Sequence, residues 1–461
     1  MGFAGNKFFF LLCCVGFMAG FIYRILPIDS FDQYHLPPPK NASAKNSNLT
    51  YEESEFADLL KLIDWPSPPF SITNFSLSTN PKQCWYELMS PRTVYHVGET
   101  LEVLITAKDH YGKLKSYGGD FFQAKLHSPK IKAGVTGHLK DLNNGTYLAT
   151  FLLPWEGEAQ VNIRLIHSSE AVSVLKDKRE RHPEKVYFNG YFHFNGSSEV
   201  KECNIAVRGG DVCNYSDPVT GDPWQCLKPQ KMPCDSLVYH SMGGYRRVTN
   251  SLEDSLLNGS VTAQNIKGAG AFTSIKIEPA TNSTALKRID LHVNYQSGPL
   301  LAVDPDVGLV MRWRAHGNPL RTTKTMISDL HYETAHLYGI GGGPQTVVVF
   351  TLWAHFTTYP VSVYIQRLFR LRRAISSLLF RSPKTTVLIK SANTGYKSIY
   401  GSDWLSLQLD ILLRAIFKGM AVTILDVWDM TSCHYLPDNI HPGAPVIRNE
   451  VDLMLSYICP R

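Results

Sequence analysis

The alternation of apolar and polar positions divides the chain into two regions. Between residues 84 and about 174, apolar residues alternate with polar ones in short runs, separated by turn residues about every 8–12 positions. This pattern is typical of an antiparallel β-sandwich. From about residue 300, strand-like runs alternate with helical ones, which predicts a parallel, doubly wound sheet with its functional residues at the carboxyl ends of the strands.

Three further patterns complete the predicted organisation. In the second region we expect strands over 346–353, 385–389 and 422–427, and helices over 361–381, 403–417 and 450–457. The stretch before residue 80 is rich in Pro, Asn and Ser and predicts a stalk. The charged residues 176–185 predict a solvated loop, and residues 201–285 a cysteine-rich linker.

The N-terminus carries an uncharged apolar run over residues 8–23, between Lys7 and Arg24. A cleaved signal peptide requires small residues at the −3 and −1 positions, and with Ala19 at −1 the −3 position is Phe17. We therefore favour an uncleaved type II anchor over a cleaved signal peptide. Both place the rest of the chain in the lumen or outside the cell, and a buried core helix is the weaker alternative.

Glycosylation sequons support this topology. Eight N-x-S/T motifs precede residue 283 and none follows it, a distribution that predicts a heavily glycosylated N-terminal half. The acceptors are Asn41, Asn48, Asn74, Asn144, Asn195, Asn214, Asn258 and Asn282.

Seven cysteines follow the apolar run, and an oxidising compartment favours disulfides among them. The cluster over 203–234 predicts one or two local bridges. The disulfide candidates are Cys203, Cys213, Cys226, Cys234, Cys433 and Cys459. Since seven is odd, one thiol is left free or pairs with another chain. A zinc site is the weaker alternative, because the chain has no C-x-x-C pair.

Composition narrows the function classes. The 461 residues are 44% hydrophobic and 19% charged, which excludes a largely disordered or collagen-like chain. No dinucleotide fingerprint, Walker loop or zinc finger is present, so we expect no cofactor and no metal. The net charge of +6 is modest, and the secretory compartment excludes nucleic acid. Residues 334–402 lack any acidic residue, which predicts a solvated helix face or an electropositive surface for an acidic glycan.

Candidate chemistry lies near the C-terminus. Asp438 precedes His441 by three residues, after the last predicted strand. This is the arrangement of SGNH-type hydrolases, in which a carboxylate orients an imidazole and the imidazole deprotonates a serine.

Four segments carry a resemblance to a known family: GKLKSYGGDFFQAKL, CLKPQKMPCDSLVYHSMGGY, RSPKTTVLIKSANTG and LDVWDMTSCHYLPDNIHP. They resemble the neurexophilin and PC-esterase domain (NXPE) family. The resemblance implies an Ig-like, neurexophilin-like β-sandwich followed by an α/β PC-esterase domain of SGNH type, which acts on acyl esters of glycans. It also implies that Asp438 and His441 are the catalytic pair, and that Trp353 and His355 line the pocket. A packing role for His355 is the alternative.

The chain departs from this family at the nucleophile. The family's Gly-Asp-Ser block, which follows a strand and opens a helix, is missing between Asn282 and Leu300, so the PC-esterase-like domain is incomplete. The nearest match contains Ser236 but lies in the cysteine-rich linker, and Ser402 reads as a helix N-cap. We therefore expect a pseudoenzyme, either natural or a shortened form of an active parent.

The expected organisation is a signal anchor or signal peptide at 1–26, a glycosylated stalk at 27–80, a sandwich at 81–200, a linker at 201–285 and a PC-esterase-like domain at 286–461. The expected protein is a secreted or type II membrane glycoprotein with a glycan or extracellular protein partner. Two alternatives stay open: a binding protein acting through its sandwich, and an active O-acetyl transferase or esterase with an unrecognised nucleophile.

Overall fold

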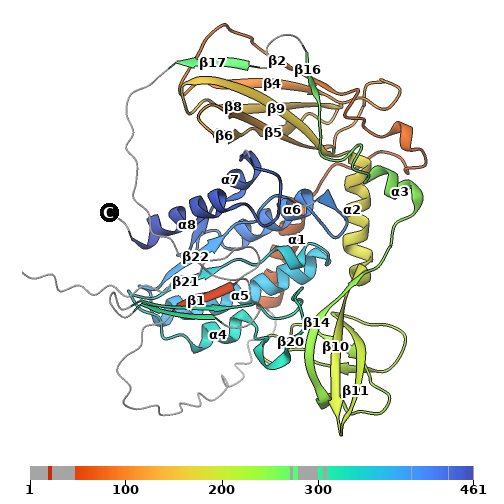
Figure 1. Cartoon of the computed structure of the whole chain (residues 1–461), viewed down its shortest axis with the longest axis vertical. Helices are drawn as coiled ribbons and strands as arrows, with labels where there is room; N and C mark the ends of the chain where they lie inside the picture. Colours follow the sequence, from red (N-terminus) through yellow and green to blue (C-terminus); the bar gives the residue numbers. More distant parts are fainter. Residues whose placement is uncertain are drawn as a thin grey trace, which may run out of the picture.

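The computed structural model describes residues 19–22, 47–269, 274–278, 300–304, 309–395, 397–434 and 436–459. They form an antiparallel β-rich N-terminal region and a C-terminal mixed α/β region with parallel strands. In Figure 1 the sandwich lies at the top, the α/β region below it, and a further sheet at the lower right.

Two packed sheets make the sandwich, and the alternating pattern explains their core. Val103, Ile105, Phe151 and Ile163 are fully buried where every second side chain of a strand points between the sheets. One sheet contains β2 (Trp85–Leu88), β4 (Thr100–Thr106), β7 (His138–Asp141), β8 (Thr146–Leu152) and β16 (Lys267–Gly268). The other contains β3 (Tyr95–His96), β5 (Phe121–Ser128), β6 (Ala133–Thr136), β9 (Gly157–His167), β15 (Gln264–Asn265) and β17 (Ser274–Glu278).

A third sheet includes the cysteine-rich segment. Its strands are β10 (Val186–Phe194), β11 (Ser197–Asn204), β12 (Val212–Asn214), β13 (Gln225–Leu227), β14 (Leu237–Tyr245) and β20 (Thr325–Met326). Disulfides join Cys203 to Cys226 and Cys213 to Cys234, which confirms the predicted local bridges. Cys433 carries a free thiol, so its assignment to a disulfide is wrong, and Cys459 belongs to neither bridge.

The charged stretch 176–185 is not a solvated loop. It lies in α2 (Ser169–Arg181) and a following 3-10 turn, and Lys185 is fully buried. Lys185 Nζ donates to the carbonyl oxygens of Lys178 at 2.8 Å and Thr358 at 2.7 Å. Burial lowers the pKa of Lys185 to about 7. The run of charged residues wrongly predicted exposure, because buried carbonyl oxygens accept the hydrogen bonds of Lys185 in place of water.

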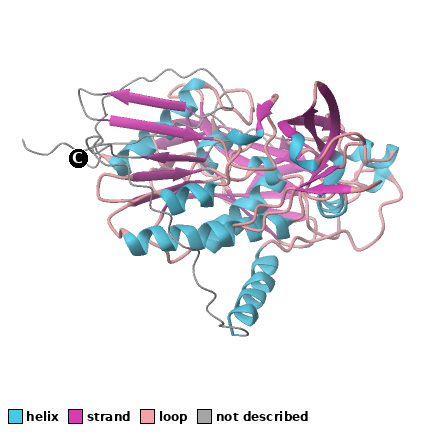
Figure 2. Cartoon of the chain, turned by 90° about the horizontal axis from the view of Figure 1, so that it is seen from below, coloured by secondary structure: helices cyan, strands magenta, loops and turns pink. Residues whose placement is uncertain are grey.

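The α/β region contains the predicted elements. Its sheet order is β18 (Leu300–Asp304), β19 (Leu309–Arg314), β1 (Ala19–Ile22), β21 (Val347–Phe350), β22 (Thr386–Lys390) and β25 (Thr423–Leu425), and the last three are parallel. Helices α5 (Val361–Arg381), α6 (Asp403–Ile416) and α8 (Ala444–Ile458) pack against it (Figure 1). Figure 2 shows, in cyan and magenta, helices lying alongside strands. The expected strands and helices of this region are thus confirmed.

Strand β1 comes from the N-terminal apolar run. Its backbone pairs antiparallel with both β19 and β21. The rest of the run, and with it the predicted signal or anchor, lies outside the described residues. Within the described ranges no helix combines the length and the hydrophobicity needed to cross a membrane.

The prediction of a stalk is wrong from residue 47 onward. Leu59 of helix α1 (Ser47–Leu62) and Ile63, which follows the helix, are buried in the core of the α/β region, among residues of α5 and α6. The sequence did not predict this helix, because its few apolar residues lie in a stretch rich in Pro, Asn and Ser.

The basic tract over 334–402 is largely neutralised by acidic residues from elsewhere in the chain. Arg367 and Arg370 pair with Asp222 of the cysteine-rich segment. Arg372 and Arg373 pair with Glu55 and Glu52 of α1. These four arginines lie on α5, and their ion pairs contradict the expected electropositive surface along this helix. The sequence did not indicate the pairs, because each carboxylate is distant in sequence.

Candidate functional site

The carboxyl ends of the three parallel strands meet, as expected for an α/β sheet. The chain leaves β21 toward Trp353 and His355 and leaves β22 toward residues 391–395. After β25 it forms α7 (Trp428–Cys433) before it reaches Asp438 and His441, so a helix separates this pair from the last strand.

Buried hydrogen bonds hold the loop after β22 against the loop that carries His441. Asn393 Nδ2 donates to the Ile440 carbonyl oxygen at 3.3 Å. Gly395 has a φ of +132°, and a Cβ there would lie 2.4 Å from the backbone of Asn439. Only glycine permits this approach.

A buried histidine pair lies at the end of β21. His316 Nε2 lies 2.7 Å from His355 Nδ1, and His316 Nδ1 lies 2.6 Å from the Gly317 carbonyl oxygen. Burial lowers the pKa of His316 to about 3, so this imidazole is neutral. Because the carbonyl can only accept, His316 carries its proton on Nδ1, and its Nε2 accepts from His355 Nδ1.

His441 lies close enough to His355 for the two charges to interact. Burial is the main cause that lowers the pKa of His355, and His316, Arg321 and His441 lower it further. Trp353 and His355 are 5% and 3% exposed. His441 is thus within electrostatic range of His355, and His355 packs against His316.

Asp438 is bonded to residues outside this histidine cluster. Its carboxylate accepts a hydrogen bond from Arg164 Nη1 at 2.7 Å and an ion pair from Lys397 Nζ. Burial would raise its pKa, but the hydrogen bonds from Lys397 and Arg164 lower it to about 2. The expected hydrogen bond between Asp438 and His441 is not formed, because two cations hold the carboxylate.

The serines closest to a Gly-Asp-Ser pattern have structural contacts. Ser236 Oγ donates to the Pro233 carbonyl oxygen at 2.6 Å, beside the Cys213–Cys234 bridge. Ser402 Oγ accepts from Trp404 N at 3.1 Å, which confirms its prediction as the N-cap of α6.

Sequence reasoning missed Arg164, Lys397 and His316. Arg164 lies on β9 of the sandwich, 274 positions before Asp438. The residues around Arg164 in the sequence give no sign that its side chain pairs with a carboxylate so far along the chain. Among the described residues no group of three or more His, Cys, Asp or Glu is placed to hold a metal ion.

Five sequon asparagines are exposed in the described part of the chain: Asn74, Asn144, Asn195, Asn214 and Asn258. Asn48 lies in α1, while Asn41 and Asn282 lie outside the described residues.

Sequence comparisons match most of the chain. Residues 51–263 match the neurexophilin family, and residues 278–459 match the family described as NXPE family member 4-like, C-terminal domain.

One solved structure is also similar in part. A crystal structure of a DUF4785 family protein from Legionella pneumophila is 12% identical, over 35% of this chain and 52% of that chain, with a TM-score of 0.15. The chain thus covers about half of that protein, and the TM-score is too low to indicate a shared fold. With its neurexophilin and C-terminal regions both matched, the chain belongs to the NXPE family.

Proposed function

We propose that this chain is a secretory-pathway glycoprotein that binds carbohydrate and does not transfer or hydrolyse acyl groups. One observation carries the non-catalytic part of the proposal: the carboxylate of Asp438 is held by Arg164 and Lys397, with its hydrogen bond to Arg164 at 2.7 Å. An orienting carboxylate must bond to the imidazole that it serves. In this chain Asp438 is bonded to Arg164 and Lys397 in place of His441.

The missing nucleophile supports the same proposal. A His–Asp pair without an attacking hydroxyl leaves only weak residual catalysis from binding and polarisation. Ser236 is a poor replacement, because its hydroxyl is bonded to Pro233 beside a disulfide. On this proposal the α/β region has an SGNH-like ancestry, and the sandwich is Ig-like.

The compartment is part of the proposal. Two disulfides and the neurexophilin match are consistent with the secretory pathway. We further propose that the N-terminal apolar run directs the chain into the secretory pathway. Residues 19–22 of this run form β1 of the α/β sheet, so they are not part of a membrane anchor. N-terminal sequencing of the mature protein would show whether the residues before them are retained.

The test of the proposed function is acetyl-ester turnover by the purified, full-length chain. We expect the rate to equal that of His441→Ala. Turnover that is lost in both His441→Ala and Ser236→Ala would overturn the proposal and identify Ser236 as the nucleophile. Turnover lost in His441→Ala alone would also overturn it and point to a different hydroxyl.

A further inference from the structure

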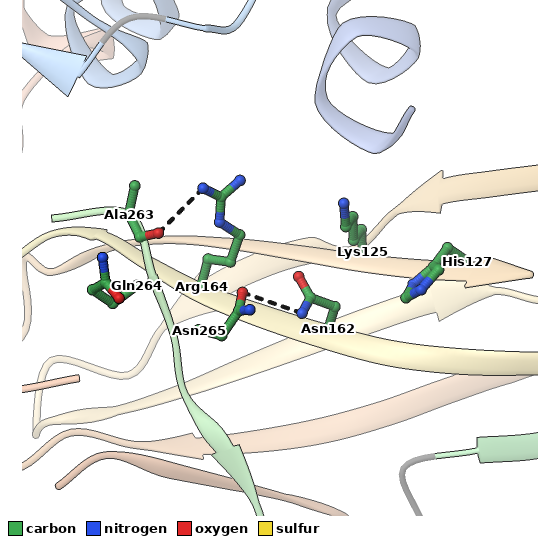
Figure 3. Close-up of a pocket in the computed structure, with 7 residues that line it drawn as sticks. All are labelled: Lys125, His127, Asn162, Arg164, Ala263, Gln264 and Asn265. Carbon is green, nitrogen blue, oxygen red and sulfur yellow. Dashed lines mark hydrogen bonds between the residues drawn. The ribbon is translucent and has the colours of Figure 1, made fainter. Parts of the chain in front are cut away.

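A small polar cavity of about 310 Å³ lies on the sandwich face that is turned toward the α/β region (Figure 3). Its walls come from three neighbouring strands: β5, β9 and β15. The lining includes two basic side chains, Lys125 and Arg164, and three amides, from Asn162, Gln264 and Asn265. This volume is at the lower end of the range for small-molecule sites.

The basic side chains point to one side of the sheet. In Figure 3 Lys125 and Arg164 rise together toward the ribbon of the C-terminal region. That region supplies Lys397, which pairs with the same Asp438 carboxylate as Arg164. Arg164 and Lys397 thus share one carboxylate, and Lys125 lies within electrostatic range of the same carboxylate, so basic side chains outnumber acidic ones at the mouth of the cavity.

Lys125 shows that this charge is not compensated. Its ammonium makes no hydrogen bond or ion pair with any residue in the described part of the chain. Burial lowers the pKa of Lys125, and Arg164 lowers it further, while Asp438 raises it. Beside it, His127 Nδ1 is buried without a hydrogen-bond partner among the described residues. An ammonium without a paired carboxylate, as at Lys125, favours an anion.

We propose that this cavity binds the acidic group of a carbohydrate, a carboxylate or a sulfate ester, between Lys125 and Arg164. The amides of Asn162, Gln264 and Asn265 offer donors and acceptors that suit sugar hydroxyls. The inference rests on the proposed carbohydrate-binding function and assigns its site and ligand class. Asp438 competes with the ligand for Arg164 and Lys397.

The test uses three sugars that differ only at C6: galacturonic acid, galactose 6-sulfate and galactose. They are titrated into the full-length chain and followed by calorimetry or ligand-detected NMR. We expect at least one acidic sugar to bind at least tenfold more tightly than galactose, and added salt to weaken that binding. Binding by one acid alone identifies the recognised group. Equal binding of all three sugars, or no binding of any, would overturn the inference.

Substitutions locate the site. Lys125→Gln and Arg164→Gln should each weaken the binding of the acidic sugar about tenfold, the effect of losing one charge-assisted contact. Lys140→Gln is the matched control, because Lys140 is exposed on β7 of the opposite sheet. Asp438→Asn should strengthen binding, since it removes the competing carboxylate.

Two results separate this inference from the proposed function. A Lys125→Gln protein that binds the acidic sugar as well as Lys140→Gln would overturn the site. Acetyl-ester turnover would overturn the non-catalytic proposal and leave the binding data unaffected. Lys125 has no structural partner among the described residues, so its substitution is not expected to disturb folding.

Discussion

Arg164 Nη1 donates a 2.7 Å hydrogen bond to the Asp438 carboxylate, and this contact joins the sandwich to the loop that carries His441. Thr136 and Ser432 make a second contact between the same two regions, with their hydroxyl oxygens 2.7 Å apart. Arg164 of the neurexophilin region and Lys397 of the C-terminal region therefore hold Asp438 together. The C-terminal region considered alone would show only one of these two partners.

The pKa of Asp438 makes this contact testable by acid. Burial would raise this pKa, but Lys397 and Arg164 bring it to about 2, below the value of about 3.9 for an unfolded aspartate. A lowered carboxylate pKa contributes stability above pH 4, and that contribution is lost as the pH falls toward 2.

We therefore expect the free energy of unfolding to differ between wild type and Asp438→Asn in a pH-dependent way. The difference should shrink by about 1–2 kcal/mol from pH 6 to pH 2, with allowance for partial exposure. Urea unfolding of both proteins across this range measures it. A difference that does not change with pH would contradict the assignment of the low pKa to Asp438.

The sequence predicted the elements of the α/β region well, because helical and strand periodicities are local. Ser402, for example, is the N-cap of α6 as expected. The sequence did not predict ion pairs between distant segments. Asp222 and Glu333 neutralise Arg367 from outside the tract, so an unbroken run of basic residues suggested an open surface that the fold does not have.

The same limit applies to the candidate site. The spacing of Asp438 and His441 fits a catalytic pair, and their loops do meet the ends of the parallel strands. The partner of Asp438 depends instead on how the sandwich packs against this region. Burial of Lys185 was missed for a related reason, since the carbonyl of Thr358 that accepts from it lies 173 positions away.

Arg367 offers a test of the buried charge network. Its Nε donates to Asp222 at 3.0 Å, its Nη1 to Glu333 at 3.2 Å, and its side chain is 3% exposed. Arg367→Ala leaves two buried carboxylates without this cation, a change that costs about 3–5 kcal/mol. Thermal or urea unfolding should show this loss.

Arg373 on the same helix provides the control. Its pair with Glu52 is exposed, with 57% and 43% of the two side chains accessible. Arg373→Ala should change the unfolding free energy by no more than about 0.5 kcal/mol. Equal effects of the two substitutions would show that the Arg367 network is not a buried one.

The exposed sequons predict glycosylation at defined positions. Asn144 and Asn214 lie on the surface, and each side-chain oxygen accepts from the hydroxyl two residues later, at 2.6 Å. When the chain is expressed in the secretory pathway, an N-glycosidase should lower its apparent mass. Asn144→Gln and Asn214→Gln should each remove one step of that shift. No shift for the wild-type chain would contradict the lumenal topology.

The two disulfides should stabilise the third sheet. They close loops with sequence separations of 23 and 21, and loops of this length correspond to about 3 kcal/mol per bridge. The segment between them has few apolar residues to bury, so it depends on these bridges. The double substitution Cys213→Ser and Cys234→Ser should therefore make it sensitive to proteolysis.

Limited proteolysis with identification of the fragments measures this effect, and cleavage is expected first between residues 205 and 235. Cys433→Ser is the control, because this thiol lies in α7 and outside both bridges. Non-reducing peptide mapping provides the direct measurement of the pairing. If it recovered Cys203 linked to Cys213, the pairing in the structure would be wrong, and the strand register between β11 and β13, which places Cys203 opposite Cys226, would fail with it.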